Sequence, residues 1–158
     1  MSTRNTTLVI DREWAKEHTE GFAVNPEEVI EHSYVNMYIH HDGYLKWQGV
    51  QLANWIQWQE QDADTSSRDI KEGSRMASKL VHDFYYDSCF LYSTKPDQID
   101  SQYTYILWTG ASDVWITCWD NYDQTCKFVG QPKDMIKKHG GDMDYTKWGE
   151  EIMSTMKI

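Results

Sequence analysis

The period of the apolar pattern changes after Pro96, and no other feature of the sequence restricts the fold as much. Beyond that point, apolar residues alternate with others in three short segments that are separated by polar turns. The segments are Tyr103–Trp108, Val114–Trp119 and Cys126–Val129, and the turns are Thr109–Asp113 and Asn121–Thr125. A period of two residues with short connections is typical of neighbouring antiparallel strands. The sequence therefore predicts a three-stranded antiparallel meander.

Before the meander, apolar residues recur in steps of three and four, which is the period of a helix. The clearest start signal is Asn25-Pro26 followed by two glutamates, because Asn caps a helix, proline fits its first turn and acids favour its positive end. Apolar residues continue at helical spacing, so we expect a helix from Asn25 to about His41. Further helices are expected at residues 11–20 and 69–89 before the meander, and at 132–139 and 145–156 after it. The pattern over residues 44–60 is ambiguous: its apolar spacing suits a helix, but Gly49 interrupts it.

N-terminal helices, a three-stranded antiparallel meander and two C-terminal helices together make an α+β fold. The apolar run Leu8-Val9-Ile10 indicates no more than a short edge strand. A chain of 158 residues is most economically one domain with its own core. We therefore expect a single globular domain over residues 1–158.

The chain combines a formal net charge of −10 with 8 Trp, 10 Tyr and 4 Phe residues. Negative charge repels nucleic acids and anionic membranes and attracts basic proteins. The stretch Gln48–Gln59 lacks charged residues, but it is shorter than the about 20 apolar residues that cross a bilayer. Trp and Tyr are enriched where proteins bind one another. We therefore expect a protein partner with a basic surface, and neither direct nucleic-acid binding nor membrane binding.

The cysteines and the N-terminal residues indicate a reducing compartment. The three cysteines are odd in number and show no C-x-x-C spacing, which favours free thiols. Residues 1–7 lack the apolar run of a secretory signal. The expected location is therefore the cytoplasm.

Two His-Asp pairs provide a candidate metal site, with His41, His82 and Asp83 as its ligands. Imidazole and carboxylate groups can hold a divalent ion that activates water. This pattern supports an alternative function as a small metal-dependent hydrolase or ligand-binding domain. The simpler interpretation is that His40 and His41 lie at a helix C-terminus, where cationic side chains are favoured. No P-loop, G-x-G-x-x-G, G-x-S-x-G or H-E-x-x-H motif is present. The sequence therefore assigns no catalytic residue, metal or cofactor.

Function is instead expected to reside in a surface of aromatic anchors ringed by carboxylates. The expected anchors are Trp47, Trp55, Trp58, Trp115 and Trp119, and the expected acids are Glu60, Asp62, Asp64, Asp113, Asp120 and Asp123. Central anchors supply affinity, and surrounding charges accelerate encounter. This predicts a small acidic interaction protein that inhibits or occludes a basic-surfaced protein, such as a nucleic-acid enzyme or a toxin. A second alternative is an oligomeric structural or assembly subunit whose aromatic face joins its copies.

Overall fold

A computed structural model of the protein describes residues 3–61, 71–85, 89–110 and 113–140. Its centre is a mixed six-stranded sheet with the strand order β3-β2-β1-β4-β5-β6. The strands are β1 Asn5–Asp11, β2 Asn36–Ile39, β3 Cys89–Tyr92, β4 Tyr103–Thr109, β5 Val114–Asp120 and β6 Thr125–Gly130. β1 and β4 are parallel, and the other neighbouring pairs are antiparallel.

β1 is the first strand of the chain and one of the two central strands of the sheet. It pairs with β4 in parallel over all seven of its residues, and with β2 on its other side. Residues Asn5–Ile10 are buried throughout. A strand that is covered on both faces has a continuous apolar run, so Leu8-Val9-Ile10 belongs to the centre of the sheet. The expectation of an edge strand there was wrong.

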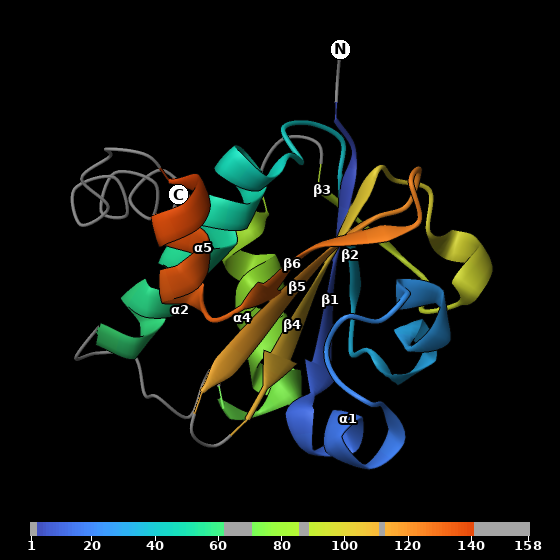
Figure 1. Ribbon diagram of the computed structural model, residues 1–158, viewed down its shortest axis with the longest axis horizontal. Coiled ribbons are helices and arrows are strands. Elements are labelled where there is room, and N and C mark those ends of the chain that lie inside the picture. The colour runs from blue at the N-terminus through green and yellow to red at the C-terminus, as the bar shows by residue number, and fades with distance from the viewer. Residues whose placement is uncertain (1–2, 62–70, 86–88, 111–112, 141–158) are drawn as a thin grey trace.

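Helices and turns cover both faces of this sheet (Figure 1). Their bounds are α1 Arg12–His18, η1 Pro26–Glu28, η2 Ile30–His32, η3 Leu45–Gly49, α2 Val50–Gln61, α4 Gly73–Phe84, η4 Pro96–Gln98 and α5 Pro132–His139. One face, here named the α1 side, is covered by α1 and by residues 19–35, which include the 3₁₀ turns η1 and η2. The other face, the α2 side, is covered by α2, α4 and α5 (Figure 1).

Successive strand residues point to opposite faces, so the sheet has an apolar core on each side. The larger core, on the α2 side, includes Val9, Met37, Leu107, Ile116, Leu52, Trp55, Ile56, Leu80, Phe84 and Met135. The smaller core, on the α1 side, consists of Leu8, Ile10, Ala15, Val29, Ile30, Ile106 and Trp108. Burying one large aliphatic side chain contributes about 2 kcal/mol. These two cores therefore supply most of the favourable free energy of folding.

The predicted α+β fold of N-terminal helices, a three-stranded meander and two C-terminal helices is wrong. The three predicted strands exist as β4, β5 and β6, but they form half of a mixed sheet, and the chain begins with a strand. The local pattern indicates which segments are strands. It does not indicate which distant segment pairs with the free edge of β4, and that partner is β1, at the other end of the sequence. The short helices predicted at 11–20 and 132–139 are confirmed as α1 and α5.

The helix predicted from Asn25 to about His41 is also wrong. The start signal is real, because the Oδ1 atom of Asn25 accepts a hydrogen bond of 3.0 Å from the backbone N–H of Glu27. It begins only the three-residue turn η1, however, and the chain is soon extended as β2. Met37 and Ile39 point together into the larger core. Burial of this alternating pattern outweighs the helical spacing, since tertiary packing overrides local propensity.

The helix predicted over residues 69–89 extends too far. α4 ends at Phe84, and Cys89 already begins β3, a strand that the sequence pattern did not predict. The ambiguous segment over residues 44–60 forms the π-helical turn η3 and then α2. At their junction, a Cβ atom on Gly49 would lie 3.0 Å from the Sδ atom of Met135, so glycine permits the close approach of α5. The predicted C-terminal helix over 145–156 lies outside the described residues.

The three cysteines are free thiols, and no helix in the described part of the chain is long and apolar enough to cross a membrane. Cys118 and Tyr105 are both completely buried in the larger core. Burial disfavours a thiolate or phenolate, and it raises the pKa of Cys118 above its ordinary 9.0 and that of Tyr105 well above 10.0.

We expect the free energy of unfolding to decrease as the pH rises above about 9. In that range the unfolded chain releases the thiol proton while the folded chain retains it, so a higher pH favours unfolding. Replacing Cys118 by Ala should reduce this decrease by up to about 1.4 kcal/mol per pH unit. Urea denaturation under reducing conditions, from neutral pH upward, measures both slopes. Equal slopes for the wild type and the Cys118→Ala variant would contradict the prediction.

Candidate functional site

The five predicted tryptophan anchors do not form one surface. Trp55 is 1% exposed in the larger core, so it cannot contact a partner in the folded protein. Trp47 is 37% exposed in η3, and Trp58 is half-buried against the larger core. Trp115 and Trp119 are half-buried on the α1 side of β5. Two of the five residues therefore share the α1 side.

Several of the predicted acids have structural partners. Asp113 forms an ion pair with Arg12, whose side chain is almost buried, and it accepts two further side-chain hydrogen bonds. This network connects the end of β1 with the start of β5. Glu60 is exposed on α2, and partial desolvation raises its pKa. Asp62 and Asp64 lie outside the described residues.

Asp120 and Asp123 lie close together but have different environments. Asp120 is 4% exposed, and its Oδ1 atom accepts hydrogen bonds from the backbone N–H groups of Tyr122 (2.9 Å) and Asp123 (3.1 Å). These bonds close the turn between β5 and β6. Asp123 is exposed and forms an ion pair of 3.4 Å with Lys127. Of the two acids, only Asp123 presents its carboxylate to solvent.

Replacing Asp120 by Ala should lower the free energy of unfolding by about 1–3 kcal/mol, because two backbone donors lose their acceptor. The matched Asp123→Ala change should cost less than about 1 kcal/mol, since an exposed ion pair contributes little. Chemical denaturation of both variants measures the difference. Equal costs would show that Asp120 does not hold the turn.

The three metal candidates do not come together in one site, although His82 and Asp83 contact each other. Asp83 is completely buried, and one carboxylate oxygen accepts a hydrogen bond of 2.9 Å from Nε1 of Trp55. Its other oxygen lies 2.9 Å from Nδ1 of His82 and 3.7 Å from Nζ of Lys79. His41 is exposed in the loop after β2. Among the residues that the structure describes, no three His, Cys, Asp or Glu side chains could hold a metal ion together. Asp83 instead connects α4 to α2.

Replacing Asp83 by Ala should destabilise the protein by about 3 kcal/mol, because the buried indole N–H of Trp55 loses its acceptor and a buried polar network is broken. Asp83→Asn should cost less, since the amide oxygen can still accept that bond. Intrinsic tryptophan fluorescence during urea denaturation measures the stability of both variants. If Asn costs as much as Ala, the hydrogen bond to Trp55 is not what Asp83 contributes.

Aromatic side chains that the sequence analysis did not select gather on the α1 side of β2 and β3. Tyr38 of β2 stacks on Tyr92 with ring centroids 4.9 Å apart, and it lies 6.3 Å from the ring of Phe90. Phe90 is 55% exposed and Tyr92 is 39% exposed, whereas Tyr38 is buried beneath them. Tyr122, in the turn between β5 and β6, is 70% exposed. We name Tyr38, Phe90, Tyr92 and Tyr122 the aromatic patch.

Charged groups border the aromatic patch. Desolvation raises the pKa of Tyr38, Arg4 opposes this rise, and Tyr92, Asp100 and Tyr122 add to it electrostatically. The carboxylate of Asp100 is 87% exposed and lies 3.8 Å from the guanidinium of Arg4. The patch therefore has an apolar centre and a charged, solvent-exposed border. This is the usual composition of a protein-binding site.

Glutamates gather on the elements that cover the same side of the sheet. Between residues 13 and 31, one exposed lysine, Lys16, accompanies six exposed glutamates. They are Glu13, Glu17, Glu20, Glu27, Glu28 and Glu31, and we name them the acidic face. Ring stacking of Trp14 on His32, with centroids 4.1 Å apart, holds α1 beside η2 and so brings these acids together. Like charges at this density create a negative potential that attracts cations.

The acidic face and the aromatic patch are neighbours. η1 contacts η4, and the chain enters η4 directly from the end of β3. The side-chain nitrogen of Asn36 bonds the backbone oxygens of Ser93 (3.0 Å) and Gln98 (3.3 Å), which fixes η4 beside β2 and β3. Asn25 also bonds Gln124 in the turn that carries Tyr122. The α1 side thus combines exposed aromatic rings with a border of carboxylates.

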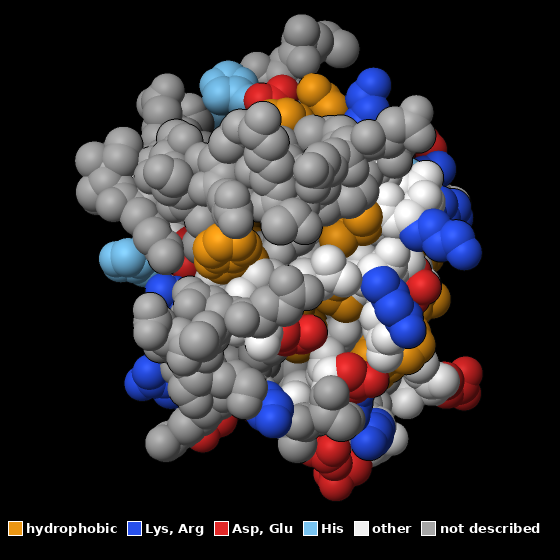
Figure 2. All heavy atoms as spheres, turned by 90° about the vertical axis from the view of Figure 1, so that its left-hand side faces the viewer, with side chains coloured by type: hydrophobic (Ala, Val, Ile, Leu, Met, Phe, Trp, Pro, Cys, Tyr) orange, Lys and Arg blue, Asp and Glu red, His pale blue; other side chains and the backbone are white. Residues whose placement is uncertain are grey.

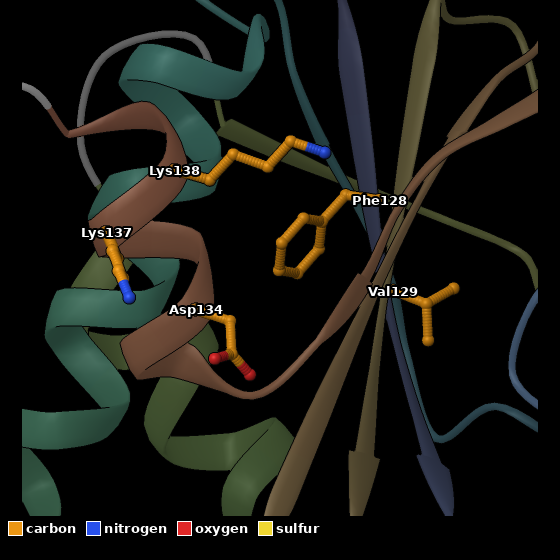
Figure 3. A pocket seen from close by; sticks show the side chains of 5 residues that line it. All are labelled: Phe128, Val129, Asp134, Lys137 and Lys138. Atoms are coloured by element: carbon orange, nitrogen blue, oxygen red, sulfur yellow. The ribbon is translucent and has the colours of Figure 1, made fainter.

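The described residues of the α2 side show a different distribution of charge. In Figure 2, which views it directly, Lys, Arg, Asp and Glu side chains are dispersed among the described residues. A hollow of about 490 Å³ lies there between β6 and α5. Its lining includes the Phe128 ring, Lys137 and Lys138, and the two ammonium groups point in different directions (Figure 3). The hollow therefore does not focus charge on one point.

Neither protein-family models, nor curated proteins, nor solved structures match this chain. The aromatic residues of the patch escaped sequence analysis because their exposure depends on β3 being an edge strand. One signal was available: Phe90, Leu91 and Tyr92 form an uncharged run outside the helical spacing of the preceding segment. The glutamates of the acidic face were visible in the sequence, but their proximity depends on how α1 and η2 pack.

Proposed function

We propose that the protein is an acidic interaction protein that binds a basic-surfaced protein partner and occludes that partner's basic surface. The observation that carries this proposal is the junction of the acidic face with the aromatic patch on one side of the sheet. Trp115 and Trp119 lie on the same side of the sheet but are half-buried. The exposed anchors are instead Phe90, Tyr92 and Tyr122.

The two components have different roles in binding. The glutamates are exposed, and a negative potential accelerates the approach of a basic protein. The aromatic rings supply apolar area at low conformational cost, and such residues dominate the affinity of many interfaces. A basic surface that lies against both would be covered over an extended area. Inhibition by occlusion is the consequence if that surface binds a nucleic acid or another anionic ligand.

The test begins with cross-linking in the native host and mass-spectrometric identification of the partner, followed by association kinetics with that purified protein. Raising the ionic strength from about 0.05 to 0.5 M should slow association markedly and change dissociation much less. At low salt, the double variant Glu27→Gln/Glu31→Gln should associate about tenfold more slowly than the wild type.

The matched control is Glu60→Gln/Glu72→Gln, which removes the same charge from α2 and from the start of α4 and should leave association nearly unchanged. Circular dichroism of both double variants verifies that the fold is intact. Equal effects of the two double variants would show that net charge matters and the acidic face does not. An association rate that is indifferent to salt would overturn the proposal.

A further inference from the structure

β3 is an edge strand of the described sheet, and its own residues provide no protection against pairing on the side away from β2. It has β2 on one side and no other described strand on the other. Its residues Cys89–Tyr92 include no charge and no proline, and its register with β2 is regular. Phe90 and Leu91 are 55% and 58% exposed. Natural edge strands are usually guarded by charge, proline or a bulge, and β3 has only its shortness.

The opposite edge of the same sheet is guarded. β6 carries the exposed Lys127, which forms an ion pair with Asp123. Its pairing with β5 is interrupted by a register shift between Cys118 and Trp119. The same fold thus uses charge and irregularity at one edge and leaves the other uncharged and apolar. This contrast indicates that the β3 edge is kept free for pairing.

We propose that β3 accepts an extended, basic segment of the protein partner as an additional strand of the sheet. The backbone N–H and C=O groups on the free side of β3 would pair with the segment, as in other cases of strand addition. Alternate side chains of the segment would contact Phe90 and Tyr92 on the α1 side and Leu91 on the α2 side, because these residues point to opposite faces.

Charge complementarity determines the kind of segment. The Tyr92 end of β3 leads into η4, where Asp97 is exposed, and η4 contacts η1, which carries Glu27 and Glu28. A strand advances about 3.3 Å per residue, so a segment that continues past Tyr92 reaches these acids within a few residues. Lysine or arginine at those positions is favoured. The inference rests on the proposed function for this charge, and it adds the mode of binding.

The probe is a random dodecapeptide library displayed on phage and selected against the full-length protein. Enriched peptides should combine alternating apolar residues with Lys or Arg. A synthetic copy of the best peptide should protect those backbone amides of residues 90–92 that point away from β2 from hydrogen exchange. The proline variants Phe90→Pro and Leu91→Pro add a backbone test. Adjacent amides point in opposite directions, so one of these prolines removes an outward N–H and the other removes a bond to β2.

The outward proline should leave the protein folded and weaken peptide binding at least tenfold. If neither proline variant folds, Leu91→Thr keeps the backbone and should still weaken binding by losing apolar contact. The matched control is Val129→Thr on β6, an exposed position on the guarded edge that should bind the peptide as the wild type does.

Strand addition would be overturned if no peptides were enriched, or if peptides bound without protecting residues 90–92. It would also be overturned if, in the absence of peptide, the protection of these amides increased with protein concentration. The last result would mean that β3 pairs with a second copy. Basic peptides that depend on Glu27 and Glu31 but leave β3 unprotected would refute strand addition and leave the proposed function intact. Protection of β3 by peptides without net positive charge would refute the basic occupant and, with it, the proposed function.

Discussion

The parallel pairing of β1 with β4 is the interaction on which the rest of the structure depends. It joins strands that are separated in sequence by β2, α2, α4 and β3, and it places both in the centre of the sheet. Closing so long a connection costs conformational entropy, although this cost grows slowly with length. Burial of β1 on both faces offsets it, because its side chains contribute to both apolar cores. Without this pair, β1–β3 and β4–β6 would be two separate three-stranded sheets with less to bury.

The position of β1 also determines which surface stays open. The chain leaves β1 into α1, and residues 19–35 then return across the same side before β2 begins. These elements cover Ile10 and Trp108 near the carboxyl end of β1. They leave the edge strand β3 with exposed rings on that side. α1 and residues 19–35 form a single layer whose outer surface is exposed to solvent, and exposed positions tolerate glutamate. The neighbouring aromatic and acidic surfaces are thus consequences of the topology.

Local signals predicted part of this fold and no more. The alternation of β4, β5 and β6 and the short helices α1 and α5 follow from their own residues, and the structure contains them. β2 could not be distinguished from a helix, because Met37 fits both a helical spacing and an alternating one, and burial beside β1 decides between them. β3 has four residues, and so short a segment cannot show a two-residue apolar alternation clearly. For the site, composition indicated aromatic anchors, but the apolar area of Trp55 serves the core. Exposure of Phe90 follows from a pairing order that no local pattern contains.

The two edges of the sheet differ in their protection against pairing. Selection against aggregation would favour a protected edge, and selection for binding would favour an unprotected one. An exposed apolar edge strand is a hazard, since any extended chain can pair with it. At β6 the hazard is reduced by a charged side chain and an irregular register, so the chain has the means of protection. The residues of β3 include neither a charged side chain nor an irregular register, although a single lysine in place of the exposed Leu91 would supply the charge. Shortness limits non-specific pairing there, because four residues offer few backbone hydrogen bonds. A partner that also satisfies the neighbouring acids and aromatic rings gains contacts that a random strand lacks. In the proposed complex, the edge alone would bind weakly, and the surface around it would confer the specificity.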